Sequence, residues 1–351
     1  MKKYSDLIAQ LEEQKHPLAE RITALQFKNN PMLEERYGQE GRDRCREDAI
    51  YHLEYLVEAL RVQSPGIFNH YLEWAHHMLS ARNIPLSDLA ENVRYIKQAV
   101  REKLPEEDLS PAVDYLDSGI NHLKDINPHN ETHLKPDNPL VEEAREYLNL
   151  LLNSKRQRAA ELVDELVDRG VSVSDIYEHI FQATQYEVGV LWQRNEITVA
   201  HEHYCTAATQ LIMSRLYPLI FSGQKKGSRL VACSVASELH EIGIRMVSDF
   251  FEMDGWDTYY MGSNMPDRHL MQSIREHEAD LLAISVTLPL HIGKVEQLVD
   301  DIRSRSEFDH LKIMAGGYPF TVVPDLWERI GTDATARTAR QAVSKANKLV
   351  N

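Results

Sequence analysis

Apolar residues in the first third of the chain recur with the period of an α-helix. Ile50, Leu53, Val57 and Leu60 are three or four positions apart, so that they share one helix face. A similar stripe follows the Ser-Pro-Gly break that begins at position 64. Strand-like alternation is not seen. The pattern predicts a helical domain of five or six elements over residues 1–126.

A second helical pattern follows a polar, proline-punctuated segment, residues 127–138, which we interpret as a linker. The predicted helices are 139–153, 155–169, 173–194 and 198–221. Four helices joined by short connections indicate an up-down bundle. We therefore expect a four-helix bundle domain over residues 139–222.

After residue 228 the pattern changes to short apolar strands that alternate with amphipathic helices. The predicted strands lie near 230–235, 256–261, 280–286 and 311–315, and the predicted helices near 241–253, 266–276, 291–304, 320–330 and 335–349. This alternation predicts a Rossmann-like, doubly wound parallel α/β domain over residues 229–351.

Composition and charge narrow the function classes. The 351 residues have a net charge of −15, which disfavours DNA or RNA as a direct partner because nucleic-acid binding relies on Lys and Arg. The sequence has no apolar run long enough to span a membrane and no secretory signal at its start. Cys45, Cys205 and Cys233 form neither a disulfide framework nor a metal cluster. We expect a cytoplasmic protein.

Three loops that follow predicted strands contain residues suited to ligand binding. Because the carboxyl ends of parallel strands share one edge of a sheet, these loops should lie together. Glycines there let a planar ligand approach the backbone, and a serine can donate a hydrogen bond to a ring nitrogen. Neither G-x-G-x-x-G nor a P-loop is present, which argues against a phosphate site. The residues of this predicted site are Glu238, His240, Gly243, Ser285, Thr287, Gly316 and Gly317.

The separations within this set are informative. Between Gly243 and Ser285 there are 41 residues, and between Thr287 and Gly316 there are 28. In order and spacing the set resembles the motif Asp-x-His-x-x-Gly, Ser-x-Leu, Gly-Gly of the cobalamin-binding domain family. The resemblance implies that His240 is the lower axial ligand of cobalt, and that the serine and the glycine pair receive the displaced nucleotide tail.

Two positions depart from that family motif. Glu238 occurs where the family usually has Asp, and Thr287 replaces the Leu of Ser-x-Leu. A carboxylate two residues before the ligand can still orient the imidazole and raise its basicity. The longer arm of the glutamate is expected to loosen control of the Co–N bond.

A second motif lies in the predicted bundle. Nine residues separate Trp192 from Glu202, and His203 follows. This Trp-x9-Glu-His pattern resembles the adenosylcobalamin-dependent photoreceptors, light-sensing repressors related to MerR regulators. The resemblance implies that the indole packs on the adenosyl group and that the Glu and His fence it. In that family a histidine next to the Trp can ligate cobalt after illumination. Because Gln193 has that position here, the upper ligand would be His201, His203 or water.

The first domain has no basic helix-turn-helix like that of the repressors. Its histidines and aromatic residues instead suggest a pocket for a haem or a linear tetrapyrrole, and the order of domains resembles the photocobilins, receptors that pair cobalamin with biliverdin. Cys45 is either a covalent tether for a bilin or an ordinary cysteine. The alternative is a dimerising helical domain with an aromatic core. The candidate residues for a second chromophore are His52, His70, Tyr71, Trp74 and His77.

These features lead to one main hypothesis and two alternatives. The first is a non-enzymatic photoreceptor in which light cleaves the Co–C bond of adenosylcobalamin. Cleavage would change the packing of the bundle and the association of protein copies in a homo-oligomer. Since no effector domain follows residue 351, output would pass through oligomerisation or an unknown partner protein. The second is a corrinoid protein of a methyltransferase system, and the third is a helical adaptor with a degenerate cobalamin domain. The Trp-x9-Glu-His motif argues against the second, because a methyl ligand needs no adenosyl fence.

Overall fold

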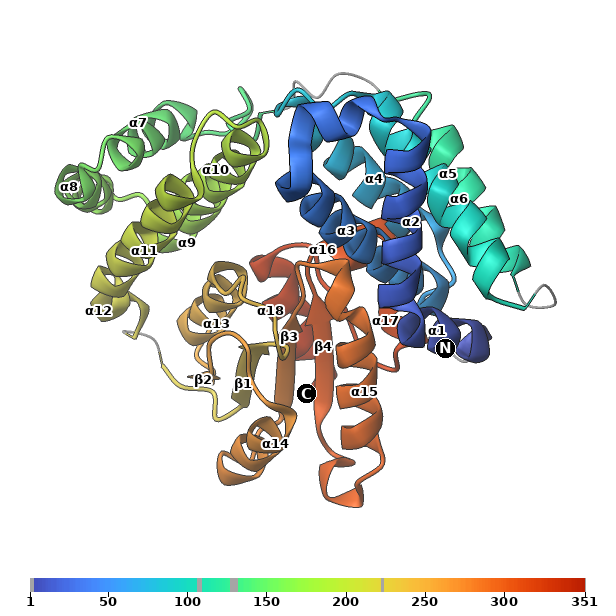
Figure 1. Cartoon of the computed structure of the whole chain (residues 1–351). Coiled ribbons are helices and arrows are strands. Elements are labelled where there is room, and N and C mark those ends of the chain that lie inside the picture. The colour runs from blue at the N-terminus through green and yellow to red at the C-terminus, as the bar shows by residue number, and fades with distance from the viewer. Residues whose placement is uncertain (1–2, 106–108, 127–131, 222–223, 351) are drawn as a thin grey trace. The chain divides into compact units, whose positions relative to one another are not determined.

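The computed structural model describes residues 3–105, 109–126, 132–221 and 224–350, and Figure 1 shows their helices and strands. Tertiary contacts divide the chain into two compact units. The first, which we call the helical unit, consists of residues 1–128, 288–296 and 318–330. The second, which we call the sheet unit, consists of residues 129–287, 297–317 and 331–351. None of the described helices is both long and apolar enough to cross a membrane.

The N-terminal part of the helical unit is entirely helical where it is described, as predicted. Its helices are α1 (Ser5–Glu13), α2 (Lys15–Asn29), α3 (Met32–Arg61), α4 (Pro65–Ser80), α5 (Leu86–Lys103) and α6 (Ser110–His122). Leu53 and Phe68 have no exposed surface and lie in the core of this unit. A Cβ atom at Gly119 would lie 2.6 Å from the Leu72 side chain. The glycine therefore allows α6 to pack closely against α4.

Two segments from the C-terminal third of the sequence also belong to the helical unit. They contain the short helix η3 (Pro289–His291), the start of α15 (Ile292–Arg303), α16 (Tyr318–Val322) and α17 (Leu326–Arg329). The prediction of one continuous helix over residues 320–330 is wrong. Pro324 lies between α16 and α17, where its missing N–H and its ring disfavour a continuous helix.

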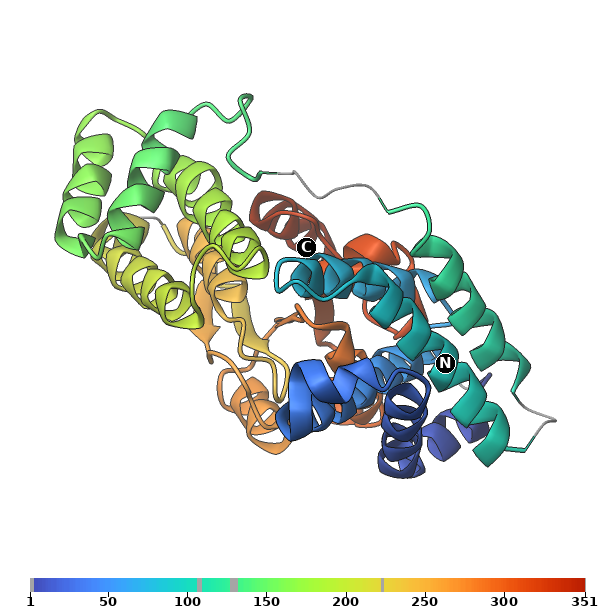
Figure 2. The same ribbon diagram turned by 45° about the horizontal axis from the view of Figure 1, so that its top comes forward.

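The bundle of the sheet unit contains the helices α7 (Val141–Leu152), α8 (Arg156–Asp168), α9 (Val173–Ile176), the π-helical turn η2 (Tyr177–Gln182), α10 (Ala183–Gln193), α11 (Val199–Arg215) and α12 (Tyr217–Ile220). Figure 2 shows these helices in green to yellow, packed side by side. The elements α9, η2 and α10 follow one another directly and form the predicted third helix. At its start the Ser172 hydroxyl accepts a hydrogen bond from the Asp175 N–H, the expected capping interaction.

The described part of the segment before the bundle packs against it. The Thr132 hydroxyl and the His133 N–H both donate to Glu187 Oε2, at 2.8 and 2.7 Å. Asn138 donates from its side-chain amide to the carbonyl oxygen of His179 at 2.7 Å. Residues 127–131 of the predicted linker lie outside the described residues. The domain boundaries proposed from the sequence stay a prediction.

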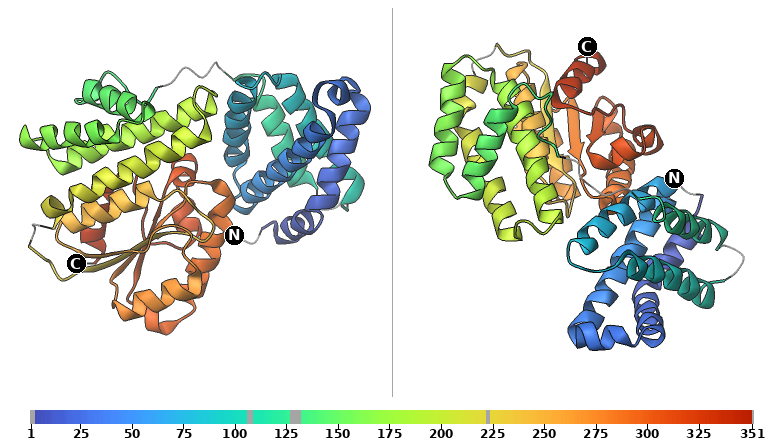
Figure 3. Two further views of the ribbon diagram at one scale, coloured as in Figure 1. Left: turned by 60° about the vertical axis from the view of Figure 1, so that its left-hand side comes forward. Right: turned by 90° about the horizontal axis from the view of Figure 1, so that it is seen from above.

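The sheet is parallel throughout and has the strand order β2-β1-β3-β4. Its strands are β1 (Arg229–Ser234), β2 (Asp257–Tyr260), β3 (Leu281–Ser285) and β4 (Lys312–Gly316), and the helices α13 (Ile242–Met253), α14 (Asp267–Glu276), α15 and α18 (Ala339–Leu349) alternate with or follow them. Figure 3 shows helices on both sides of the twisted sheet. The predicted doubly wound α/β fold is confirmed. Since the strand order reverses between β1 and β3, the switch point lies where such folds bind ligands.

Polar contacts join the bundle to the α/β part of the sheet unit. Tyr177 donates from its hydroxyl to Asp249 Oδ2 at 2.9 Å, and the Gln210 amide donates to Glu241 Oε1 at 2.7 Å. Tyr177 is fully buried, and its ring packs beside that of Phe250. Apolar residues of both parts form one continuous core, which fixes the bundle over the α/β part.

Candidate functional site

The loop after β1 holds an exposed histidine against a buried carboxylate. The Nδ1 atom of His240 lies 2.6 Å from Oε1 of Glu238, and the backbone N–H of His240 donates to the same oxygen at 3.0 Å. The glutamate side chain is 0% exposed, whereas that of the histidine is 57% exposed. An imidazole held through Nδ1 in this way presents Nε2 to a metal, with its ring orientation and tautomer set by the carboxylate.

The second carboxylate oxygen of Glu238 is also held by the chain. Oε2 accepts a hydrogen bond from the backbone N–H of Thr287 at 2.8 Å. The predicted site residues Glu238, His240 and Thr287 are thus brought together across the switch point. Thr287 contributes its backbone N–H to this contact. The contact therefore does not need the threonine side chain, which departs from the family motif.

The same surroundings act on the charge of the imidazole. The hydrogen bond that His240 donates to Glu238 and the negative charges of Glu238 and Glu202 raise the pKa of His240, and partial burial opposes them. Glu202 belongs to α11 of the bundle. The bundle thus contributes a carboxylate that favours the charged imidazole.

A slot with a volume of about 130 Å³ opens beside the sheet. Four predicted residues line it, namely Gly243, Ser285, Gly316 and Gly317. Ser285 pairs in register with Gly316 across β3 and β4, which explains why the serine and the glycine pair meet. The predicted gathering of these residues at one edge of the sheet is therefore what the structure shows.

The glycines of the slot have different roles. A Cβ atom at Gly243 would meet nothing within 4 Å, whereas one at Gly317 would lie 1.9 Å from the carbonyl oxygen of Val286. Gly317 also has a φ of +114°, which disfavours any side chain. Gly317 is thus required by the backbone, while Gly243 leaves open space that a ligand can fill. The space beside Gly243 is thus compatible with a ligand group that enters the slot.

The bundle also lines the slot, which the sequence did not indicate. Glu178 and Gln182 come from the π-helical turn η2, and Arg337 and Thr338 precede α18. Single π-helical turns recur at functional sites in proteins. No sequence pattern announces such a turn, since its residues have ordinary helical spacing.

The proposed upper-face residues lie at facing ends of two bundle helices. Trp192 is half-buried near the end of α10. Glu202 Oε2 lies 2.5 Å from His203 Nδ1, and Glu202 Oε1 accepts from the Thr206 hydroxyl at 3.1 Å. His201 instead caps α11, with its Nδ1 2.8 Å from the Thr198 hydroxyl. The imidazole of His201 is thus used to cap the helix, whereas the side chain of His203 is 76% exposed.

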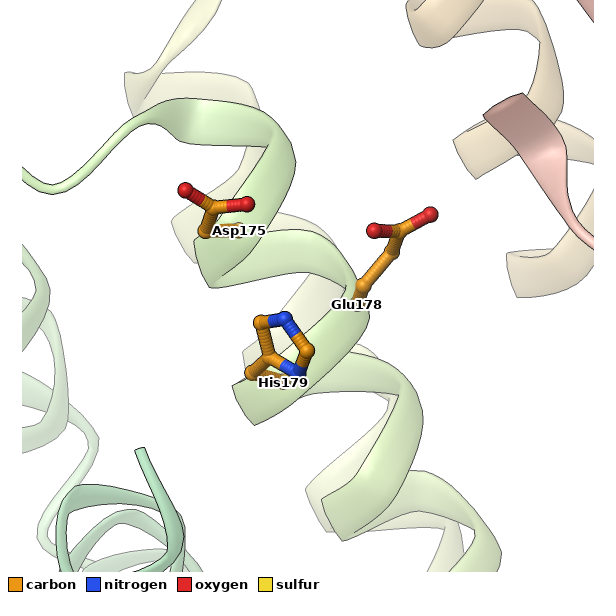
Figure 4. Close-up of side chains that lie close together, drawn as sticks. All are labelled: Asp175, Glu178 and His179. Atoms are coloured by element: carbon orange, nitrogen blue, oxygen red, sulfur yellow. The ribbon is translucent and has the colours of Figure 1, made fainter. Parts of the chain in front are cut away.

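One further group of side chains in the described part of the chain has the spacing of metal ligands. Figure 4 shows Asp175, Glu178 and His179 on successive turns of one helix, with possible ligand atoms within 4.8 Å of one another. However, the guanidinium of Arg340 contacts both carboxylates, at 2.6 Å from Asp175 Oδ1 and 2.6 Å from Glu178 Oε2. A cation is thus already present, and we assign the group to the attachment of α18 to the bundle.

Three of the candidate residues for a second chromophore are in contact with one another. His52 Nδ1 lies 2.7 Å from the Tyr71 hydroxyl, and the Tyr71 and Trp74 rings are stacked with centroids 6.4 Å apart. His70 instead contacts the ring of Tyr318 edge-on, and His77 lies 4.0 Å from a Glu73 oxygen. His52, Tyr71 and Trp74 are thus brought together in the helical unit.

Burial determines the chemistry of two groups in this unit. Desolvation lowers the pKa of His52 to about 4, so that the imidazole is neutral at pH 7 and available for hydrogen bonding. For Cys45, burial and then the nearby carboxylates raise the pKa to about 11. A thiol with such a pKa is a weak nucleophile, which does not favour a covalent tether at this position.

Comparison with protein families divides the chain in the same way. Residues 228–346 and 143–217 match two models described as B12 binding domains. Residues 3–123 match the phycobilisome protein family. The chain therefore contains B12 binding domains, as predicted, and a cobalt corrinoid is the cofactor that such domains imply.

Several corrinoid proteins match more than half of this chain. The dimethylamine corrinoid protein of Methanosarcina barkeri is 26% identical over 59% of this chain and 96% of its own length. A corrinoid protein of Desulfitobacterium hafniense is 24% identical over 57% of this chain and 94% of its own length. The monomethylamine corrinoid protein of Methanosarcina barkeri, with 24% identity and a TM-score of 0.53, covers 60% of this chain and 99% of that one, and shares the fold.

Proposed function

We propose that the sheet unit holds a cobalt corrinoid with His240 as the lower ligand and the slot as the receptor of its nucleotide tail. The observation that carries this proposal is the buried Glu238 carboxylate, which holds the imidazole through Nδ1 beside a slot lined by Gly243 and Ser285. A bound corrinoid supplies a cobalt centre with an upper group that can be cleaved by light or transferred. The chain binds, orients and shields that centre.

For the use made of the corrinoid we propose light sensing with adenosylcobalamin. The grouping of Glu202 with His203 on α11, near the end of α10 that carries Trp192, supports a fence for a bulky upper group. An indole offers a flat apolar wall, and a carboxylate accepts hydrogen bonds from ribose hydroxyls or an adenine amine. Loss of the upper group would then change the packing of the bundle and with it the association of protein copies.

The helical unit is proposed to hold a linear tetrapyrrole, biliverdin or a relative, rather than a haem. The match of residues 3–123 to the phycobilisome protein family supports a bilin. His52 is neutral and hydrogen-bonded to Tyr71, whose ring is stacked with that of Trp74. Together the three side chains would offer an imidazole and flat aromatic surfaces to such a ligand.

A second candidate function is a corrinoid protein of a methyltransferase system. One named relative is a dimethylamine corrinoid protein and the other a corrinoid protein, and they match 59% and 57% of this chain. These names support the second candidate better than the first. The match of the helical unit to the phycobilisome family supports the first.

One experiment separates the two candidates. The purified chain is loaded in the dark with adenosylcobalamin or with methylcobalamin, and visible spectra and sedimentation are recorded before and after green light. A light sensor should prefer adenosylcobalamin, and its Trp192→Ala variant should lose that preference. Equal binding of both forms, together with no change in sedimentation on illumination, would favour the methyl carrier.

A further inference from the structure

Both loops of the slot continue directly into the helical unit. Thr287 is followed by the segment 288–296, and Gly317 by the segment 318–330, and both segments have their contacts in the helical unit. We propose that Glu58, on α3, positions His240 through the segment 288–296, so that the helical unit regulates the corrinoid site. This inference rests on the proposed role of His240 as the cobalt ligand.

Glu58 caps the start of α15 from within the core of the helical unit. The side chain is 9% exposed, and its Oε2 accepts the Gly293 N–H at 3.1 Å. Oε1 accepts a hydrogen bond from Arg61 Nε at 3.2 Å. A carboxylate in this place satisfies a helix N–H that lacks an intrahelical partner and interacts favourably with the helix dipole.

The start of α15 packs closely against Arg61. A Cβ atom at Gly293 would lie 2.8 Å from Arg61 Nε, so that the guanidinium packs directly on the backbone of α15. The same guanidinium also donates to Glu12 Oε1 at 2.8 Å. The start of α15 is therefore held by a buried carboxylate and by the arginine that this carboxylate positions.

A short, structured segment joins this anchor to the axial histidine. Five residues lie between Thr287 and Gly293 in the sequence, and four of them belong to the turn η3 (Pro289–His291) or to the start of α15. The Thr287 N–H in turn donates to Glu238 Oε2 at 2.8 Å, and Glu238 Oε1 holds His240. A displacement of α15 relative to the sheet would thus alter the hydrogen bond that holds the completely buried carboxylate.

The other loop of the slot is anchored to the helical unit as well. Arg329 Nη1 donates to the carbonyl oxygen of Val62 at 2.5 Å, and Tyr318 packs edge-on with His70. The two loops are themselves joined, because the Val286 N–H donates to the carbonyl oxygen of Gly316 at 3.0 Å. Both loops therefore continue into segments whose contacts lie in the helical unit.

The test compares Glu58→Ala and Glu58→Gln with the matched control Glu54→Gln. Glu54 is one turn earlier on α3 and pairs with Lys15. The first readout is amide hydrogen exchange of the full chain without corrinoid, followed in the peptide that contains Thr287. The second is the fraction of bound cob(II)alamin that shows nitrogen hyperfine splitting from histidine in its electron paramagnetic resonance spectrum.

Glu58→Ala should speed exchange at Thr287 by about fivefold or more and lower the ratio of histidine-bound to histidine-free cobalt by a similar factor, in the range of typical coupling between sites. Glu58→Gln keeps an oxygen acceptor and should restore most of the protection. Glu54→Gln should behave as the native chain does. A native-like exchange rate and hyperfine fraction in folded Glu58→Ala, or equal effects of Glu54→Gln, would overturn the inference.

The two proposals fail in distinguishable ways. If the native chain binds cobalamin without histidine hyperfine splitting, the assignment of His240 is wrong and this inference falls with it. If the native chain shows the splitting and the variants keep it, His240 stands as the ligand and only the role of Glu58 is refuted. Should Glu58→Ala not fold, Glu58→Leu, which fills the space but offers no acceptor, is compared with Glu58→Gln in both readouts, and equal values for the two would refute the inference.

Discussion

His240 Nδ1 lies 2.6 Å from Oε1 of Glu238, and the histidine side chain is 57% exposed while the glutamate is fully buried. The two residues therefore have different roles. The carboxylate is fixed inside the protein by the chain itself, including the Thr287 N–H, and the imidazole reaches outward to a ligand. This arrangement leads to the first prediction.

Replacement of His240 by alanine should abolish the histidine-bound spectrum of cobalamin without unfolding the protein. Because the side chain is largely exposed, its removal should cost less than about 1 kcal/mol of stability. Visible spectra of the loaded variant and a thermal melt of the unloaded one measure the two effects. His203→Ala is the control, and it should keep the histidine-bound spectrum. A His240→Ala spectrum identical to that of the native protein would show that another residue is the lower ligand.

A larger side chain at Gly243 should block the slot. Since a Cβ atom there meets nothing within 4 Å, Gly243→Leu should fold and fill space that the nucleotide tail is proposed to occupy. We expect at least about a tenfold loss of affinity for cobalamin, or 1.4 kcal/mol, measured by fluorescence quenching or calorimetry. Cobinamide, which lacks the tail, is the matched ligand and should bind as before. Equal losses for both ligands would contradict the assignment of the slot.

The buried His52 should make the stability of the chain depend on pH. Burial lowers its folded pKa from 6.5 to about 4, so that the neutral form is favoured in the folded state. Above pH 6.5 this histidine does not lower the free energy of unfolding. As the pH falls toward 4, protonation of the unfolded chain lowers that free energy. The linked free energy of unfolding is on the order of 3 kcal/mol at most.

Denaturant unfolding at pH 7 and at pH 4.5 measures this dependence. The native chain should lose more stability between the two pH values than the variant His52→Gln, which cannot be protonated. His16→Gln, at an exposed position, serves as the control and should follow the native chain. Parallel pH dependences for the native chain and His52→Gln would be evidence that this histidine is not buried in solution.

Arg340 should act as an attachment and not as the neighbour of a metal. Its guanidinium contacts Asp175 and Glu178, but it is 50% exposed, so that Arg340→Ala should cost only about 1 kcal/mol of stability. Thermal melts with and without Zn²⁺ measure this. Zn²⁺ should not stabilise the native protein, because a cation already neutralises the carboxylates. Stabilisation of the native protein by Zn²⁺, absent in Asp175→Asn, would instead identify a metal site.

Several features of the site followed from the sequence, because they depend on local order along the chain. The strands, the loops after them and the separations from Gly243 to Ser285 and from Thr287 to Gly316 place these residues at one edge of a parallel sheet, whatever the remaining packing. The resemblance to cobalamin-binding domains was confirmed by the matches over residues 143–217 and 228–346. The preference for a photoreceptor stays a proposal, since the named relatives are corrinoid proteins.

Other features were decided only by tertiary structure. The bond from the Thr287 N–H to Glu238, the contribution of η2 to the slot and the contact of Glu58 with Gly293 join residues that are 49 to 235 positions apart or lie on different elements. Hydrophobic periodicity determines which face of each helix or strand is buried. It does not determine which partner that face meets, because this depends on the packing of the complete core. The sequence by itself therefore determined the elements and the edge of the sheet where the ligand site lies, and packing decided what holds His240 in place.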